Sequence, residues 1–426
     1  ANLGASAGAS VGIALANNLA ENSTVTAFAS DATLTSDNQT VDINATQYAL
    51  LVTVAGSGSV SKGGVTLDAT EATTDYQPTT TAYIDAVASN GRSTVTAGGN
   101  VLVDADTNLH AVTVAGNIAF NASGTSVAAT VATLVHTDST KAWVDHADVT
   151  ALAGGNASTV TTGVNLSKST DDSFDGVSVT ATSEETITTV AAGVDLGTSS
   201  ANRAASVSVN LLDETTTARI HGDTTINDDN TDADASQQIN VFAWSDTTIN
   251  SGGGAIGLSG GGTWGGGASA DSGDITKTTI ASLQSSNANA TNTISVQSLS
   301  KEKVASYEGT IEVSRGLEVA ATAGIYLFDL TTQAYVGRET GSTSKLSTDG
   351  SLLVAADSVT QAHVFAGSVA ASLGGPASVG ASFGSIHISK QTNATIEPGA
   401  KVTAKGLAAT DAISAASGGF DVTFDD

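Results

Sequence analysis

Apolar and polar residues alternate along most of this chain, and a period of two is typical of β-strands with one buried face. Near residue 100, Val101 and Val103 share one parity, whereas Asp104 and Asp106 share the other. The alternation continues along the same segment through Val112, Val114, Ile118 and Phe120. Clusters of Gly, Asn, Asp and Ser, such as residues 97–100, lie between the runs and predict turns.

The alternating segments recur as a repeat. A first tag is a Thr-rich polar run followed by Ala, a large residue and Ile or Val, as in Thr81-Ala82-Tyr83-Ile84. Its Ala-equivalent positions are 27, 82, 142, 218, 278, 334 and 394, which defines about seven copies of 55–60 residues. A second tag keeps step with the first and begins at Val41, Val101, Val177, Ile239, Ile294 and Leu352.

Two tags in step predict an all-β solenoid, because repeats of this size bury their apolar faces against their neighbours. We expect a right-handed parallel β-helix in which each repeat forms roughly two coils of three short strands. At about 4.8 Å per coil, such a chain would form a rod of about 70–100 Å. The alternative is an array of small β-sandwiches, but 60 residues are few for such a domain.

The whole of residues 1–426 is expected to form one continuous solenoid segment. The third interval between Ala-equivalent positions is longer than the others, and residues 151–176 fall within it. Insertions into solenoids usually form loops on one face. We therefore expect a loop insertion at 151–176. Because the sequence begins and ends inside the repeat, we also expect that the parent protein continues or that copies stack end to end.

Composition restricts the function classes. Aromatic residues make up only 4% of the chain, and 45 Gly accompany abundant Ala, Thr, Ser and Val, which suits thin, tightly stacked strands. The formal net charge of −27 argues against binding to nucleic acid or to anionic lipid. No run of about 18 apolar residues is present, so no membrane insertion is expected. The absence of Cys excludes disulfides and thiolate metal sites.

The repeat tags resemble those of a known family. The segments G-A-S-V-G at 8–12, T-T-A-Y-I at 80–84 and V-L-V-D-A at 101–105 are similar to repeats of large bacterial β-solenoid exoproteins. These are the filamentous-haemagglutinin-like and leukotoxin-like adhesins of Gram-negative bacteria. The resemblance implies an extracellular or cell-surface stalk that mediates attachment or aggregation. The family's secretion domain is not recognisable here, which leaves the route of export open.

Motifs that suggest an enzyme are better explained by the repeat. The esterase-like G-x-S-x-G pattern occurs at 8–12 and again at 380–384, which is the same repeat position. A nucleophile elbow is needed once and requires a following helix. The G-x-G-x-x-G at 252–257 is followed by further Gly rather than by a helix that would bind phosphate. We therefore expect no enzymatic activity and no organic cofactor.

Two groups of residues have the chemistry of metal ligands. The first is the acidic run Asp228, Asp229, Asp232 and Asp234, since Ca²⁺ takes six to eight oxygen ligands. The run does not have EF-hand spacing, so solvated acidic loops are the alternative explanation. The second group is His136, Asp138, Asp145 and His146, which lie close together around one tag. Solvated strand and turn residues are again the alternative.

The expected function is structural: a stalk or filament segment of a secreted or cell-surface adhesin. The alternative is a self-assembling fibre or surface-layer subunit that stacks end to end. The expected partners are further copies or segments of the chain itself, with cell-surface glycans or proteins as further candidates. The large residues Phe28, Tyr83, Trp143 and Tyr335 share one repeat position, where they form either an outward stripe or packing at coil corners.

Overall fold

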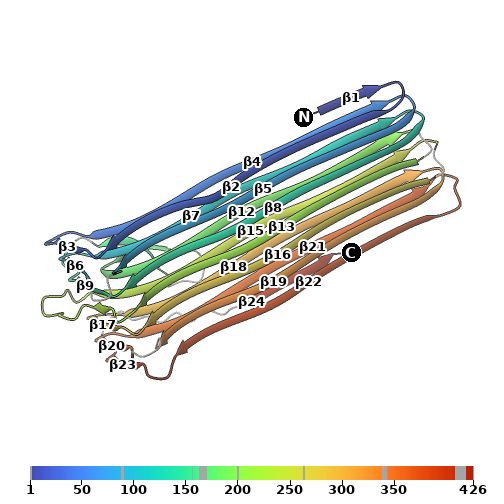
Figure 1. Ribbon diagram of the computed structural model, residues 1–426. Coiled ribbons are helices and arrows are strands. Elements are labelled where there is room, and N and C mark those ends of the chain that lie inside the picture. Colours follow the sequence, from blue (N-terminus) through green and yellow to red (C-terminus); the bar gives the residue numbers. More distant parts are fainter. Residues whose placement is uncertain are drawn as a thin grey trace.

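Three parallel β-sheets make up the fold of the computed structural model, which describes residues 2–87, 91–155, 157–162, 170–198, 201–261, 264–337, 343–407 and 419–425 (Figure 1). Sheet A contains β1 (Asn2–Ser6), β4 (Val41–Ser61), β7 (Val101–Asn121), β12 (Gly176–Gly197), β15 (Gln238–Ser259), β18 (Ile294–Ser314), β21 (Leu352–Ser372) and β24 (Gly419–Asp425). Sheet B contains β2 (Ser10–Ser30), β5 (Gly64–Asp85), β8 (Gly124–Asp145), β13 (Ala201–His221), β16 (Trp264–Gln284), β19 (Leu317–Gly337) and β22 (Ser378–Ile396).

Sheet C is narrow and closes one end of every coil. It contains β3 (Thr33–Ser36), β6 (Ser93–Ala97), β9 (Ala147–Ala151), β14 (Thr225–Ile226), β17 (Asn287–Ala290), β20 (Lys345–Thr348) and β23 (Lys401–Ala404). The chain visits sheets A, B and C in turn and then returns to sheet A one strand further along. This is a parallel β-helix, which confirms the fold class and the repeat architecture predicted from the sequence.

The expectation of two coils per repeat is wrong, because each repeat forms a single coil. Val41 of one repeat pairs directly with Val101 of the next, and Val101 pairs with Val177. Seven coils at about 4.8 Å each give a stack of only about 34 Å. The long dimension lies instead along the strands, since 21 residues of β7 at about 3.3 Å per residue span about 70 Å.

The register confirms both repeat tags and corrects one copy of the first. Ala82 pairs with Ala142, which pairs with Ala218. Ala218 then pairs with Ala281, three residues beyond the position 278 that the sequence suggested. Thr278 pairs with Thr215 instead. The Thr-rich run at 276–279 is therefore an imperfect guide to register, whereas the buried Ala is a reliable one.

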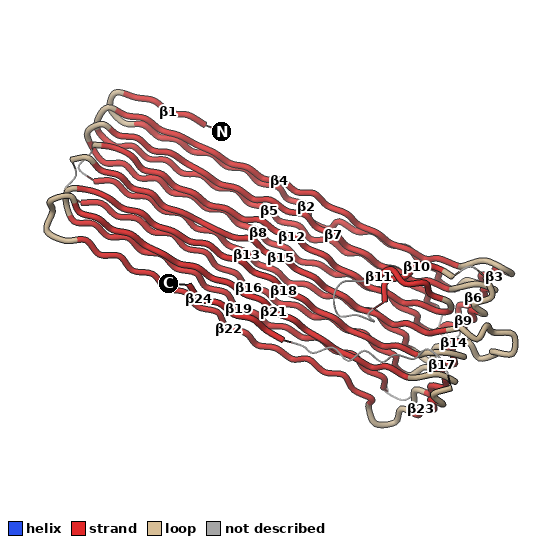
Figure 2. The backbone as a smooth tube through the Cα atoms, turned by 180° about the vertical axis from the view of Figure 1, so that it is seen from behind, coloured by secondary structure: helices blue, strands red, loops and turns tan. Residues whose placement is uncertain are grey.

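Among the described residues, the turns between the long strands lie at the two ends of those strands (Figure 2). At the corner between sheets B and C, several coils use a residue with left-handed backbone: Asp31, His146 and Ser285 have φ of 48°, 46° and 47°. Within the predicted insertion, β10 (Ser158–Thr162) and β11 (Thr170–Phe174) form an antiparallel pair outside the three parallel sheets. Asn100 links this pair to the coil by donating to Ser158 Oγ at 2.9 Å.

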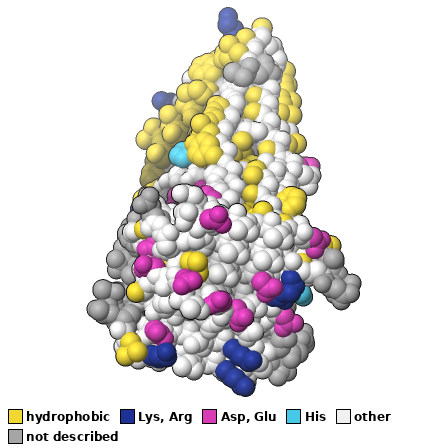
Figure 3. Space-filling model, turned by 90° about the vertical axis from the view of Figure 1, so that its left-hand side faces the viewer, with side chains coloured by type: hydrophobic (Ala, Val, Ile, Leu, Met, Phe, Trp, Pro, Cys, Tyr) yellow, Lys and Arg dark blue, Asp and Glu magenta, His cyan; other side chains and the backbone are white. Residues whose placement is uncertain are grey.

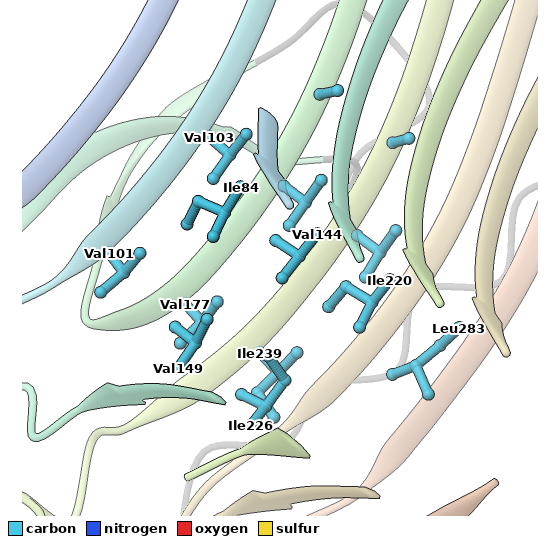
Figure 4. Close-up of a cluster of buried hydrophobic side chains, with 14 of the residues drawn as sticks. Ile84, Val101, Val103, Val144, Val149, Val177, Ile220, Ile226, Ile239 and Leu283 are labelled. Atoms are coloured by element: carbon cyan, nitrogen blue, oxygen red, sulfur yellow. The ribbon is translucent and has the colours of Figure 1, made fainter. Parts of the chain in front are cut away.

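The main apolar core fills the end of the coils that sheet C closes. Figure 4 shows its side chains, among them Ile84, Val103, Val144 and Ile220, which stack from one coil to the next. A second apolar cluster lies farther along the strands and includes Leu109, Leu134 and Ile187. Beyond it only a small cluster of Ala remains. The core therefore becomes less apolar with distance from sheet C.

The far end of the coils has the opposite polarity. Ile118 and Phe120 continue the alternation of β7, but they lie on the outer face and are 55% and 40% exposed. Their neighbours Asn117 and Asn121 point inward and are buried. The sequence pattern predicts one continuous apolar face. In the structure, the apolar residues change from the inner face to the outer face partway along each strand.

Candidate functional site

A layer of buried ionisable side chains separates the two larger apolar clusters. Its members face inward from five of the long strands: His136 and Asp138 on β8, Glu185 on β12, Glu214 on β13, Lys277 on β16 and Glu302 on β18. All six are buried, with exposures of 2% or less. Buried charges are costly unless they are paired, so the contacts within this layer decide what it can do.

Lys277 is the cation of the layer. Its Nζ lies 3.4 Å from Glu214 Oε2 and 3.5 Å from Glu302 Oε1, and it donates to Thr247 Oγ1 at 2.6 Å. Burial lowers the pKa of Lys277, but the nearby Glu214 and Glu302 outweigh that effect and raise the pKa above its ordinary value. The ammonium therefore stays charged and joins carboxylates from two neighbouring coils.

The carboxyl groups on the other side of the layer hold protons more tightly than usual. Burial raises the pKa of Glu185 well above its ordinary value, and the nearby Glu214 adds to the effect. Burial also raises the pKa of Asp138 to about 7, although Ser183 and Thr140 donate to its carboxylate. Protonation limits the net negative charge that one lysine would otherwise have to balance.

His136 faces this layer with one free nitrogen. Its Nδ1 lies 3.1 Å from the carbonyl oxygen of Tyr76, and its ring stacks on the Tyr76 ring at 5.7 Å. Burial lowers the pKa of His136, so the ring is neutral, with a donor at Nδ1 and a lone pair at Nε2. The Nε2 atom has no hydrogen-bond partner.

His136, Glu185 and Glu214 form the one group of three or more metal-ligand side chains, among the described residues, whose donor atoms lie within 4.8 Å of one another. One imidazole and two carboxylates is a set that divalent transition metals accept. Lys277 already lies against Glu214, however, and no substrate reaches these atoms without separation of the coils. The layer is therefore suited to holding coils together.

The acidic run predicted to bind Ca²⁺ lies elsewhere, in the connection from β14 to β15. Asp228, Asp229, Asp232 and Asp234 are all exposed there. Asp229 accepts from the backbone N–H and hydroxyl of Thr231, and Asp234 accepts likewise from Ser236. These bonds hold the pKa of both carboxyls below the ordinary value. No three of the four described carboxylates converge within 4.8 Å, and Ca²⁺ binding stays a prediction.

The second predicted metal group is divided by the structure. His136 and Asp138 point into the core, whereas Asp145 and His146 lie at the end of β8 beside the corner turn. The His146 Nδ1 lies 2.5 Å from Asp145 Oδ1, and His221 Nδ1 of the next coil lies 3.6 Å from the same oxygen. Proximity in sequence therefore did not bring these four side chains together.

Three of the four large residues of the first tag form an outward stack on sheet B, whereas Tyr335 is separated from Trp143 in register by Arg219 and Ser282. The Phe28 and Tyr83 rings lie 5.3 Å apart, and the Tyr83 and Trp143 rings lie 4.4 Å apart, nearly parallel in both pairs. Arg219 occupies the next position in register. A shallow groove of about 320 Å³ beside Trp143 and Arg219 is also lined by Lys141 and His221. This surface offers flat faces and cations to a partner.

The buried ionisable layer was not predicted from the sequence. Its signal was nevertheless present, because Asp138, Glu214 and Lys277 each precede the tag Ala by four residues, once the copy at 281 is placed correctly. Because a separation of four residues is even, each of these ionisable side chains points to the same inward face as the buried Ala. The described residues of the glycine-rich segment 252–267 belong mainly to β15 and β16.

Comparison with protein-family models, with curated proteins and with solved structures gives no match. The family resemblance of the repeat tags therefore rests on the residues quoted above alone. Within the described residues, no helix has the length and apolarity that a membrane-spanning helix requires.

Proposed function

We propose that this chain is a structural segment of an extended solenoid, the stalk or filament of a secreted or cell-surface adhesin that mediates attachment or aggregation. The observation that carries the proposal is the pair of open strand edges at the two ends of the coil stack. Sheet A ends at β1 and β24, sheet B at β2 and β22, and sheet C at β3 and β23. Unpaired edges are sites where further strands add.

The edges are long and have matching direction. All strands of the three sheets are parallel, so the last coil offers the same pattern of donors and acceptors that every inner coil offers its neighbour. On the first coil, β1 pairs only with residues 57–61 of β4, which leaves most of that 21-residue strand open on this side. Further coils, from the same chain or from another copy, would satisfy these groups.

The internal pairing supports a mechanical role. The strands β12 and β15 pair without a register shift from Gly176 and Gln238 to Gly197 and Ser259. The Lys277 contacts to Glu214 and Glu302 join strands of adjacent coils on both sheets. A stack held by long ladders and a buried ionic layer is stiff across the coils. Surface display and export remain inferences from the family resemblance.

A tandem fusion tests whether coils propagate. Two copies joined end to end in repeat phase are expected to form one continuous stack of twice the length, with a single, higher-temperature unfolding transition. Electron microscopy and calorimetry would measure both properties. Two separate particles joined by a linker, each melting as the single copy does, would contradict the proposal.

The self-assembling fibre is the second candidate, and the same edges favour it. Its test is sedimentation of the single chain over a range of concentrations, with variants that block the edge strand β22. Adjacent residues of a strand direct their N–H groups to opposite sides, so Pro at Ser385 and Pro at Ile386 form a matched pair. The substitution that removes an N–H facing β19 should lower stability. The substitution that removes an N–H facing away from β19 should stop assembly without lowering stability. Wild-type chains that stay monomeric throughout would exclude the fibre but not the stalk.

A further inference from the structure

The half of the slab farthest from sheet C has apolar outer faces on both sheets; we call it the apolar end. On sheet A its outward residues include Val54, Ile118 and Val369, which are 62%, 55% and 57% exposed. On sheet B they include Ile13, Leu15 and Phe383, which are 54%, 68% and 57% exposed. Figure 3 shows most of the hydrophobic side chains over the upper part of the molecule, with Lys or Arg side chains at its top and edge, and most of the acidic ones over the lower part.

The interior of the same half is polar. Buried carboxyl groups face inward there from both sheets: Asp68, Asp195, Asp271, Glu308, Glu312 and Glu318. None of the ion pairs among the described residues includes any of these six. A soluble protein normally has the reverse arrangement, with apolar groups inside and polar groups outside. The apolar end therefore exposes to water the surface that a protein usually buries.

We infer that the apolar end inserts into the hydrocarbon of a lipid bilayer, with the strands along the membrane normal and sheet C in water. The length of the apolar surface supports this orientation. From Val11 to Leu19 on β2, and from Val52 to Val60 on β4, nine residues at about 3.3 Å each span about 30 Å. A bilayer core is about 30 Å thick, and a strand crosses it in about 9–11 residues.

The distribution of charge fits the same orientation. On the outer face of sheet A, no charged residue lies at positions 54 to 60 of β4 or at the positions in register with them on β7, β12, β15, β18 and β21, although Asp425 of β24 is the register partner of Phe365. On sheet B the described exceptions are the exposed Glu71 and Arg203 and, in register with Leu19 at the limit of the apolar end nearest sheet C, Asp75, Asp274 and His387. The Arg203 guanidinium lies 4.4 Å from the centre of the Trp264 ring, near the tip, where an arginine can reach the lipid headgroups.

A bilayer fits this surface better than a second copy or another folded protein. A protein partner usually covers one contiguous patch, whereas the apolar residues here lie on two opposite faces of one slab. Lipid can cover both of these faces at the same time. The expectation that the chain does not enter a membrane rested on runs of consecutive apolar residues. Alternating strands produce no such run, even when one whole face is apolar.

The open strand edges limit how insertion occurs. Backbone groups must be paired within hydrocarbon, so inserted end coils need further coils beside them. Such coils are the same extension that the proposed function requires. Assembly is measured by sedimentation without lipid, and insertion is measured by lipid quenching, so failure of one proposal can be distinguished from failure of the other.

The three tryptophans provide a depth measurement. Trp264 begins β16 at the apolar end, whereas Trp143 lies near the end of β8 beside sheet C. With phosphatidylcholine vesicles carrying brominated acyl chains, the variant W143F/W244F should lose Trp264 fluorescence on binding. The control W244F/W264F, which retains Trp143, should not. Equal quenching of the two, or none in either, would overturn the inference.

A matched pair on β4 tests the chemistry of the surface. Val54→Asp places a charge on the outer face of the apolar end, and Thr46→Asp places one on the outer face of the same strand nearer sheet C. Both side chains are exposed, so both variants should melt like the wild type. Val54→Asp should weaken binding to neutral phosphatidylcholine vesicles by about 30-fold or more, and Thr46→Asp should not. Three results would refute membrane insertion. They are equal binding by all three proteins, dimerisation through the apolar end in place of vesicle binding, and no vesicle binding by the wild type.

Discussion

At the scale of single residues, the parity of a side chain decides its environment more than its chemistry does. Val103 and Asp104 are neighbours, yet Val103 is buried in the main apolar cluster and Asp104 faces outward beside Asp42 and Asp106. Inward parity also places Glu308 and Glu312 in the core, where no ion pair of the described residues includes them. Two predictions follow from parity, one for an apolar position and one for acidic positions.

Val103→Asp should strongly destabilise the coils, by more than about 4 kcal/mol, because a lone carboxylate would enter an apolar cluster. Asp104→Ala should be neutral or slightly stabilising. Burial raises the pKa of Asp104 to about 7, and the charges of Asp106 and Asp42 add to the effect. Thermal or urea unfolding of the two variants measures the difference. Similar losses of stability in both would contradict the assigned strand phase.

Mild acid should stabilise this protein. Burial raises the pKa of Glu308 and of Glu312 to about 8, and that of Glu318 to about 7. A carboxyl whose folded pKa exceeds its unfolded pKa binds protons more tightly when folded. Its contribution is therefore complete below about pH 4.5 and is lost as the pH rises through the folded pKa.

The melting temperature should consequently fall by several degrees as the pH rises from 5 to 9. The expected contribution is on the order of 2 kcal/mol for each of these carboxyls. Glu308→Gln should raise stability at pH 9 and flatten the profile, which calorimetry over this range would measure. A stability maximum above pH 7, unchanged in Glu308→Gln, would show that these groups are solvated.

At the scale of elements, the sequence predicted the strands, the repeat and the second tag, but not the strand length. Strands of 21 residues are far longer than the usual five or six. Small residues such as Gly56 and Gly116 do not mark turns in this chain, since both lie within long strands and are partners in register. The ionisable layer was not predicted for a related reason. Where inward and outward positions are both polar, alternation gives no sign of which face is buried.

Neighbouring coils fit one another through glycine. Gly273 of β16 pairs with Tyr326 of β19, and a methyl group added at Gly273 would overlap the Tyr326 ring. The ring is buried, and its hydroxyl donates to Asp271 at 2.7 Å. Gly253 similarly leaves room for Glu308, whose carboxylate would lie 2.7 Å from an added methyl group. Glycine in these strands is a packing residue.

Gly273→Ala should therefore cost about 1–3 kcal/mol through overpacking. The cost should shrink when Tyr326 is also replaced by Ala, because the space is then free. Gly309→Ala is the matched control, since a methyl group there would meet nothing within 4 Å. A double-mutant cycle with urea denaturation measures the coupling. Additive effects of Gly273→Ala and Tyr326→Ala would show that the two positions do not share space.

At the scale of the whole molecule, the fold is a broad slab with two different ends. The end at sheet C is built like a soluble protein, with an apolar core and acidic exposed loops. The far end has the reverse polarity, and the buried ionisable layer lies between the two larger apolar clusters. This arrangement depends on the assignment of one coil to each repeat, because two coils per repeat would give a longer and narrower rod.

Disulfide formation tests that assignment most directly, since the chain has no native Cys. Thr46 and Asp106 are partners in register on the outer face of sheet A, and Thr182 is the partner of Asp106 one coil further on. Cys at 46 and 106 should form a disulfide readily, because neighbouring strands lie about 4.8 Å apart, within the range that the bond spans. Cys at 46 and 182 should not, because two strand spacings separate them. Failure of the first pair, or equally ready oxidation of both, would contradict one coil per repeat.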